Sequence, residues 1–189
     1  MRVIAGKFRS RPLRSLSGVD IRPTSHRVRE TLFNVLTAGN PQALEGSVWV
    51  DFFAGTGAVG IEALSRGAAM VHFVEHSARA IELISRNLES LDIKQGFRII
   101  QQGTREAIAL LDAQGVRANM IFLDPPYQLE TTYLSTLQAL AESRLAAHAQ
   151  VIAEHAKRFD PGRKFKALER TRKLEQGDAA LSFYQATLT

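Results

Sequence analysis

Cysteine is absent from this chain of 189 residues, which excludes disulfide frameworks and thiolate metal sites and leaves the redox compartment undetermined. The first residues form no apolar leader, and no hydrophobic run approaches the length of about 18 residues that crosses a membrane. Low-complexity segments are also missing, and the histidines show no metal-ligand spacing with neighbouring acids. We therefore expect one globular, cytoplasmic protein without a bound metal.

Acidic residues are scarce at the N-terminus. Residues 1–36 carry eight Lys or Arg against two acidic residues, a local net charge of +6. Positions 37–189 hold 16 basic and 17 acidic residues, so the remainder of the chain is nearly neutral. Clustered cations bind a polyanion well because they release its counterions. The asymmetry predicts an N-terminal segment that faces nucleic acid, and the alternative is an ordinary solvated surface.

From Val48 onward, apolar segments of strand length alternate with amphipathic segments of helix length. This alternation is typical of an α/β fold with a mostly parallel sheet. The expected strands are residues 48–51, 70–75, 97–100, 119–124 and 150–154. The expected helices are residues 58–66, 78–91, 104–111 and 131–141. A turn at Gly177-Asp178 predicts a closing antiparallel hairpin formed by residues 164–174 and 180–188.

Before this core we expect a basic N-terminal extension, residues 1–40, followed by the α/β domain, residues 41–189. Residues 2–16 are interpreted as irregular structure or short hairpin strands, in which alternating basic residues would share one face. A helix should follow, capped by Thr24 or Ser25, with one apolar stripe and a basic opposite face. Its stripe consists of Val28, Leu32, Val35 and Leu36.

A glycine-rich loop, residues 51–60, follows the first expected strand and opens the next helix, so it offers backbone N–H groups to a nucleotide-like ligand. Gly55-x-Gly57-x-x-Gly60, with Glu75 twenty residues after Gly55, also matches the NAD fingerprint. An anion at Asp51, however, would repel a pyrophosphate. It suits the cationic S-adenosylmethionine, while Glu75 would accept both ribose hydroxyls. We therefore expect S-adenosylmethionine, with NAD as the alternative.

Asp124-Pro125-Pro126-Tyr127 ends the fourth expected strand, where open α/β sheets bind their ligands. An exocyclic amine is a poor nucleophile because its lone pair is delocalised into the base. If Asp124 and the Pro125 carbonyl each accept one N–H, the lone pair turns toward the methyl carbon. Tyr127 would stack on the flipped base. The motif predicts methylation of an amine, and the alternative is a rigid turn with a packing tyrosine.

Together with Arg22-Pro23-Thr24-Ser25-His26-Arg27-Val28-Arg29-Glu30-Thr31-Leu32-Phe33-Asn34, these motifs make the chain resemble the bacterial 16S ribosomal RNA guanine-N2 methyltransferase family over almost its whole length. The resemblance implies a Rossmann-like class I methyltransferase fold, with a seven-stranded, mostly parallel sheet whose last strand is antiparallel. It also implies 16S ribosomal RNA, in an assembling or assembled small subunit, as the partner. We expect a monomer.

The expected site residues fall into three sets. The catalytic set is Asp124, Pro125, Pro126 and Tyr127. The cofactor set is Asp51, Phe53, Gly55, Thr56, Gly57, Glu75 and Thr104. The RNA-binding set is Lys7, Arg9, Arg11, Arg22, Thr24, Arg27 and Arg29. The chain departs from the family pattern at two places. Residues 101–104 read Gln-Gln-Gly-Thr where Asp or Asn is common, so the contact to the cofactor's adenine amine is unassigned. His26 stands where the family has a small polar residue.

Other functions remain as alternatives. A DNA adenine-N6 methyltransferase would use the same loop, but the 36 residues before the core are few for a domain that reads DNA sequence. A protein glutamine methyltransferase leaves the basic segment unexplained. An NAD-dependent dehydrogenase would need a substrate domain, and an inactive RNA-binding module would be expected to lack Asp124 or Tyr127. The sequence thus favours methylation of guanine N2 in 16S ribosomal RNA.

Overall fold

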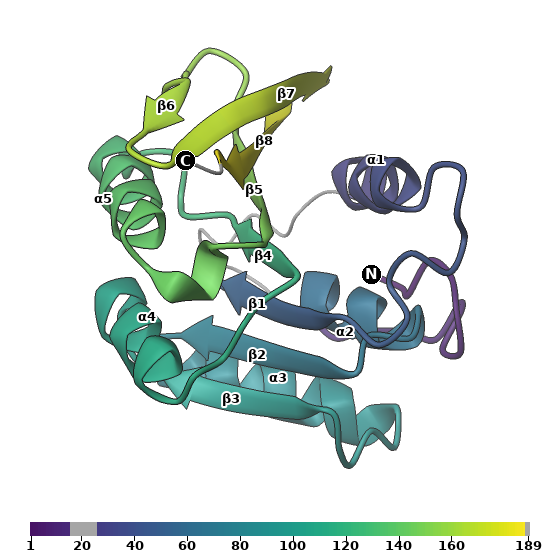
Figure 1. Cartoon of the computed structure of the whole chain (residues 1–189). Helices are drawn as coiled ribbons and strands as arrows, with labels where there is room; N and C mark the ends of the chain where they lie inside the picture. The colour runs from purple at the N-terminus through teal and green to yellow at the C-terminus, as the bar shows by residue number, and fades with distance from the viewer. Residues whose placement is uncertain (16–25, 188–189) are drawn as a thin grey trace.

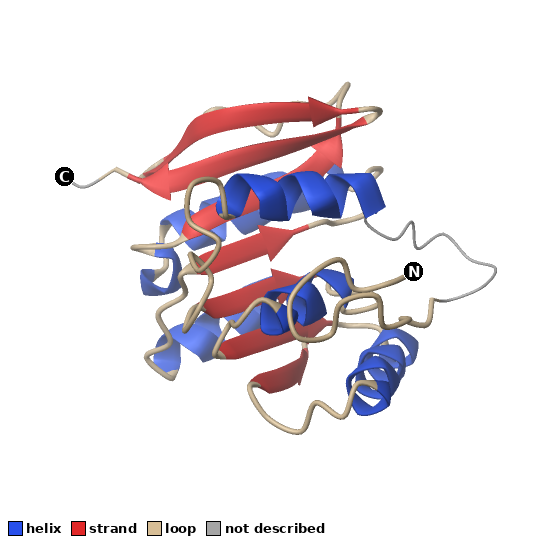
Figure 2. Ribbon diagram, turned by 90° about the vertical axis from the view of Figure 1, so that its right-hand side faces the viewer, coloured by secondary structure: helices blue, strands red, loops and turns tan. Residues whose placement is uncertain are grey.

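The computed structural model describes residues 1–15 and 26–187. At its centre is one mixed sheet with the strand order β3-β2-β1-β4-β5-β8-β7-β6 (Figures 1 and 2). The strands are β1 Val48–Phe52, β2 Met70–Glu75, β3 Phe97–Gln101, β4 Met120–Leu123, β5 Gln150–Ala156, β6 Lys164–Phe165, β7 Leu168–Gln176 and β8 Ala179–Ala186. The helices are α1 His26–Leu36, α2 Ala58–Ser65, α3 Ala78–Ser90, α4 Thr104–Ala113, α5 Glu130–Ala141 and the 3₁₀ turn η1 Arg144–Ala146.

The first five strands are parallel and form the part of the sheet that carries the site. β1 lies between β2 and β4, with β3 outside β2 and β5 outside β4. The chain therefore leaves β1 toward one edge and then returns to build the other side from β4. Open α/β sheets bind ligands beyond the carboxyl ends of the strands at such a switch point. The predicted α/β class and these five strands are confirmed.

The antiparallel end of the sheet is built from the C-terminal residues. β8 pairs antiparallel with β5 and with β7, which confirms the predicted hairpin around Gly177 (Figure 2). The two-residue strand β6 adds an eighth strand to the seven that were expected. Lys166 has a positive φ of 46°, so the chain turns there and splits the expected first arm of the hairpin into β6 and β7.

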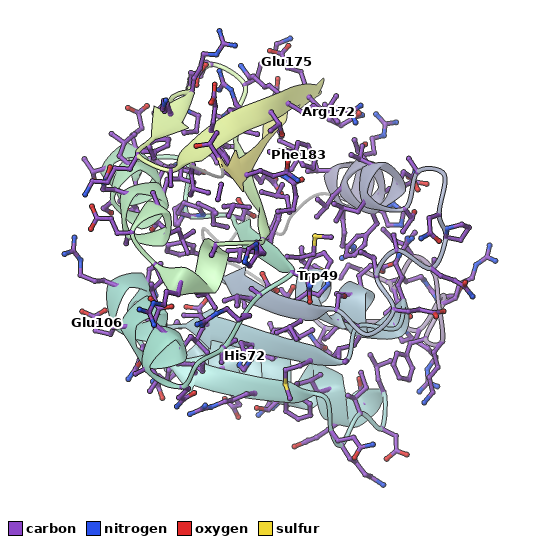
Figure 3. All side chains as sticks on the ribbon, viewed as in Figure 1. Trp49, His72, Glu106, Arg172, Glu175 and Phe183 are labelled. Atoms are coloured by element: carbon purple, nitrogen blue, oxygen red, sulfur yellow. The ribbon has the colours of Figure 1, made fainter. Side chains whose placement is uncertain are left out.

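Helices cover both faces of the sheet, so its central strands are mostly apolar. One apolar cluster unites α1, α2 and α3 with one face, and a second unites α4, α5 and η1 with the other (Figure 1). Trp49 on β1 is fully buried and stacks on Phe33 of α1 with ring centroids 5.5 Å apart (Figure 3). Within the described ranges, no helix is both long and apolar enough to cross a membrane.

The N-terminal segment, residues 1–15, packs against α2. The Glu62 carboxylate, fully buried on α2, accepts hydrogen bonds from the backbone N–H groups of Ile4 at 2.7 Å and Ala5 at 3.0 Å. Gly6 lies so close to α2 that a Cβ there would stand 1.8 Å from the carbonyl oxygen of Ser65. A single bridge between Arg2 and Pro12 is the segment's one β pairing among the described residues.

The expected alternation of basic residues along an extended N-terminal segment is wrong. Residues 7–10 form consecutive turns, in which Arg9 N donates to Gly6 O and Arg11 N donates to Phe8 O, each at 3.1 Å. The turns reverse the chain between Arg2 and Pro12, which pair antiparallel, and Lys7 N donates there to the carbonyl of Ser65 at the end of α2. The predicted helix is present as α1, but the predicted caps Thr24 and Ser25 lie outside the described residues.

Candidate active site

A cavity of about 400 Å³ opens beyond the carboxyl ends of β1, β2, β4 and β5. Its volume is within the usual range for pockets that hold small molecules. Five of the expected cofactor residues border it: Asp51, Phe53, Gly55, Thr56 and Glu75. All four expected catalytic residues, 124–127, border the same cavity. The structure therefore brings the glycine-rich loop and the Asp-Pro-Pro-Tyr loop together.

The glycine-rich loop has a strained backbone with distinct glycine roles. Phe53, Gly55 and Gly57 have positive φ values of 60°, 54° and 74°, and the phenylalanine is in a region that side chains rarely adopt. Gly57 is the N-cap of α2 and does not border the cavity. Gly60 permits close packing of α2 on the sheet, since a Cβ there would lie 2.3 Å from the ring of Phe73. Gly55 is thus the glycine that faces a ligand.

Asp51 lies beneath this loop and is only 2% exposed. Its Oδ2 accepts a hydrogen bond of 2.9 Å from the backbone N–H of Gly60 at the start of α2. The pKa of Asp51 is raised to about 8, chiefly by burial and also by the charge of Glu75, while the Gly60 hydrogen bond acts in the opposite direction. A cation in the cavity would favour the ionised form of this carboxyl.

Glu75, at the end of β2, joins two loops. Its Oε2 accepts from the N–H of Gly55 at 3.0 Å, and its Oε1 accepts from the N–H groups of His76 and Ser77 at 2.9 Å each. These bonds fix the carboxylate at the cavity wall, where Oε2 keeps a further lone pair. His76 and Ser77 also border the cavity, and sequence reasoning did not include them.

In the Asp-Pro-Pro-Tyr loop, the two proline carbonyls have different partners. The Pro126 carbonyl accepts a hydrogen bond of 2.8 Å from Leu129 N, which closes a turn. The Pro125 carbonyl accepts a hydrogen bond of 2.9 Å from the hydroxyl of Tyr133, a buried residue of α5. Burial raises the pKa of Tyr133, and the charge of Asp124 adds to this, so the hydroxyl keeps its proton. The Pro125 carbonyl is thereby oriented while one lone pair remains for a ligand.

Three functional candidates in this region were missed or misplaced by sequence reasoning. Tyr133 was missed because an amphipathic helix predicts a buried aromatic residue and gives no sign of its hydrogen bond. Glu154 on β5 borders the cavity, but in the sequence it only ends an apolar strand. Thr104 begins α4 and does not border the cavity. Among the described residues, no group of three or more acids and histidines could hold a metal ion.

The expected RNA-binding residues have different environments. Lys7, Arg9, Arg11 and Arg27 are exposed. Arg22 and Thr24 lie outside the described residues.

Arg29 requires a correction because it is fully buried. Its guanidinium donates to the backbone carbonyl of Arg2, and burial lowers its pKa. The reason is helical geometry: Arg29 is three and four residues before the buried Leu32 and Phe33, so it shares their inward face. Arg29 therefore anchors the N-terminal segment and is not available to RNA.

The nearly neutral count over 37–189 indicated that the basic character is confined to the N-terminus, but the chain has a second basic segment. Residues 157–173 alone hold eight Lys or Arg and two acids. Several of these charges are paired: Arg170 binds both oxygens of Asp160, and Lys157 lies 2.8 Å from Glu175. Arg172 and Glu175 both lie on the outer strand β7 (Figure 3). The net charge over 37–189 did not reveal this second basic segment, because acidic residues elsewhere in that range balance it.

Asn87 connects the N-terminal segment to the glycine-rich loop. This fully buried residue of α3 accepts a hydrogen bond from Arg14 N at 2.8 Å and donates to Arg14 O at 3.2 Å. Its amide also donates to the carbonyl of Thr56 at 2.9 Å. One side chain thus fixes the basic segment and the cavity wall relative to each other.

Comparison with known proteins gives matches over most of the chain. A family model described as "Conserved hypothetical protein 95" matches residues 1–185. The Bacillus subtilis protein named "Putative rRNA methyltransferase YlbH" is 30% identical over 190 residues, which cover 98% of each chain. "Ribosomal RNA small subunit methyltransferase D" of Escherichia coli K12 is 36% identical over 128 residues, covering 68% of this chain and 61% of that relative. The solved structure of "Putative methyltransferase yhhF from Escherichia coli" has a TM-score of 0.84 at 27% identity and covers 100% of this chain and 99% of its own.

Proposed function

This chain belongs to the family described as Conserved hypothetical protein 95, and from that membership we propose that it methylates the N2 amine of a guanine in 16S ribosomal RNA, using S-adenosylmethionine. The relatives that carry rRNA methyltransferase names support ribosomal RNA as the substrate. The observation that carries the reaction type is the cavity itself, which joins the glycine-rich loop to Asp124-Pro125-Pro126-Tyr127. Together these two loops would hold a methyl donor against an amine.

The cavity suits a cationic cofactor. Two carboxyl groups, those of Asp51 and Glu75, border it beside the glycine-rich loop, and each accepts a hydrogen bond from the backbone of that loop. Such a lining favours a ligand with sulfonium and ammonium groups and disfavours the pyrophosphate of NAD. Glu75 would accept from the ribose through the remaining lone pair of Oε2, and Gly55 would allow close approach of the loop backbone. When bound, S-adenosylmethionine supplies an electrophilic methyl carbon whose bond to sulfur breaks as the new bond to nitrogen forms.

The residues of the Asp-Pro-Pro-Tyr loop would align the amine. Asp124 accepts one N–H of the amine, and the remaining lone pair of the Pro125 carbonyl accepts the other. The nitrogen lone pair then points out of the base plane toward the methyl group, in line with the bond that breaks. Tyr127 stacks on the flipped base. The surplus proton of the product leaves to Asp124 or to water.

We further propose that residues 1–40 form the RNA-facing part and that residues 41–189 form the catalytic domain. The exposed Lys7, Arg9, Arg11 and Arg27 support this division, because their charges are available to phosphate. The tight packing of residues 1–15 on α2 and α3 makes this part a fixed platform, which Asn87 links to Thr56 at the cavity wall.

Incubation of the protein and labelled S-adenosylmethionine with unmodified small subunits, naked 16S RNA and duplex DNA tests the proposal. The methylated nucleoside is then identified by mass spectrometry. We expect N2-methylguanine from one or both RNA substrates. N6-methyladenine from DNA would contradict the proposed substrate and favour the DNA alternative, which uses the same loop chemistry.

A further inference from the structure

Two acidic residues from neighbouring strands border the cavity. β4 and β5 are parallel neighbours in which Leu123 pairs with Ala153, so the next residues, Asp124 and Glu154, have equivalent positions on adjacent strands. Adjacent strands are about 4.8 Å apart, and residues in equivalent positions point to the same face of the sheet. Both residues border the cavity. The proposed mechanism uses Asp124 and leaves Glu154 without a role.

Glu154 is directed toward the residues that would hold the base. It is only 4% exposed, and its Oε1 accepts a hydrogen bond of 3.3 Å from the hydroxyl of Tyr127. Its charge also contributes to the raised pKa of Tyr133, which donates to the Pro125 carbonyl. The carboxylate therefore lies within the group of side chains that surrounds the reacting amine.

Guanine and adenine differ at the atom next to their exocyclic amines. In guanine the neighbour of the N2 amine is N1–H, a donor parallel to one amine N–H. In adenine the neighbour of the N6 amine is an unprotonated N1, an acceptor. A carboxylate accepts hydrogen bonds and donates none, so it complements the N1–H of guanine and repels the unprotonated N1 of adenine. Two adjacent carboxylates thus match the two adjacent donors of guanine.

We infer that Glu154 accepts the N1–H of the target guanine while Asp124 accepts an amine N–H, so that Glu154 selects guanine over adenine. This inference rests on the proposed function, because it assumes that a guanine amine enters the cavity. Glu154 is a specificity-determining residue in this account, and it takes no part in the proton transfer.

The test compares guanine with 2-aminopurine, which keeps the amine at C2 but lacks the hydrogen on N1. Once the methylated guanine is mapped, small-subunit RNA with 2-aminopurine at that single position is prepared by ligation. The kcat/KM of each RNA is measured with the wild type, with Glu154→Gln and with the control Tyr127→Phe. The control removes the hydroxyl that donates to Glu154 and keeps both the aromatic ring and the carboxylate. Affinity for S-adenosylmethionine is measured in parallel.

The wild type should prefer guanine by about 100-fold, the magnitude of one hydrogen bond to a charged group. In Glu154→Gln this preference should fall at least about tenfold, because an amide can donate to the unprotonated N1 of 2-aminopurine. Dividing the preference of the variant by that of the wild type cancels the different reactivity of the two amines. Tyr127→Phe should slow both RNAs and keep the preference. Affinity of Glu154→Gln for S-adenosylmethionine should stay within about threefold of wild type, because the mutation leaves the cofactor contacts in place.

Several results would overturn the inference. A wild-type preference below about threefold means that N1–H is not read, and this result needs no variant to fold. An equal loss of preference in Tyr127→Phe means that Glu154 acts through the hydroxyl of Tyr127. Loss of cofactor affinity in Glu154→Gln assigns the carboxylate to the cofactor. If the wild type methylates no guanine in RNA, the proposed function fails as well, so the two failures are distinguishable.

Discussion

At the scale of single residues, the site depends on carboxyl groups whose environments differ. Asp51 is buried and has a raised pKa, whereas Glu75 is held by three backbone N–H groups. Asp51 was predicted because it ends the first expected strand, Glu75 because it follows Gly55 by twenty residues, and both border the cavity. The sequence did not indicate that Asp51 lies under the loop and holds the start of α2 through Gly60. A buried acid of this kind makes cofactor binding sensitive to pH.

We predict that affinity for S-adenosylmethionine depends on the ionisation of Asp51. The cation favours the carboxylate, and the pKa of about 8 in the free protein means that binding at lower pH must first release a proton. The ratio of wild-type to Asp51→Asn affinity should therefore rise with pH up to about 8 and then level off. Calorimetric titrations from pH 6 to 9 measure this ratio, in which the titration of the cofactor's own amine cancels.

Stability gives an independent measure of the same group. The ordinary pKa of an aspartate carboxyl is 3.8 and the pKa of Asp51 in the folded protein is about 8, so between these pH values the folded state holds a proton that the unfolded state has lost. The free energy of unfolding should fall with rising pH across this interval, and less steeply in Asp51→Asn. An identical pH profile for the two proteins would contradict the raised pKa.

At the scale of helices and strands, the sequence predicted the elements with a strong periodic pattern. The parallel strands and the helices between them were found because apolar runs and amphipathic stripes are local signals. The N-terminal turns were not found, since they depend on the shape of α2, a contact distant in sequence. Arg29 was assigned to the wrong face because a charged residue predicts exposure, whereas here its neighbours in the helix are Leu32 and Phe33.

The candidate site was predictable where its residues belong to motifs in continuous sequence. The loops containing Gly55 and Asp124 carry such motifs. The roles of Tyr133 and Glu154 arise from tertiary contacts, with the Pro125 carbonyl and the Tyr127 hydroxyl, which no spacing within the chain indicates. Asn87 likewise appears in sequence only as a polar residue within a helix.

We predict that the close approach of the N-terminal segment to α2 makes Gly6 sensitive to substitution. Gly6 and Gly39 have nearly equal positive φ values, 79° and 78°, but a Cβ at Gly39 has nothing within 4 Å. Gly39→Ala should lower the free energy of unfolding by about 1 kcal/mol through backbone strain alone. Gly6→Ala should lower it by at least about 2 kcal/mol more, since it also forces a Cβ into the Ser65 carbonyl. Equal effects in denaturant titrations would mean that the segment is not firmly packed.

At the scale of the whole molecule, a basic platform and a catalytic cavity are joined into one unit. Glu62 and Asn87 fix the N-terminal segment to α2 and α3, and Asn87 also holds the glycine-rich loop. An RNA bound to this platform would therefore be held at a constant position relative to the cofactor. The fold places these parts together although they are far apart in sequence.

We predict that RNA affinity depends on the exposed charges of the platform. Lys7→Ala combined with Arg9→Ala should weaken binding and lower the slope of log affinity against log salt by roughly 1.4 to 1.8, because two phosphate contacts are lost. The matched control is Lys94→Ala with Arg117→Ala, two exposed charges outside the N-terminal segment that precede β3 and β4, at the end of the sheet opposite the cavity. Filter binding to 16S RNA over a salt series measures both slopes. If the two double variants have the same slope, RNA binds to a surface other than this platform.

The most direct test of the account is the paired measurement of methyl transfer and cofactor affinity in Asp124→Asn. The amide occupies the same space but accepts less well and carries no charge, so the amine is no longer aligned. We predict that formation of N2-methylguanine falls about 100-fold or more while the dissociation constant for S-adenosylmethionine changes by less than about threefold. If transfer survives, or if cofactor binding is lost in step with it, Asp124 does not hold the amine and the central claim is contradicted.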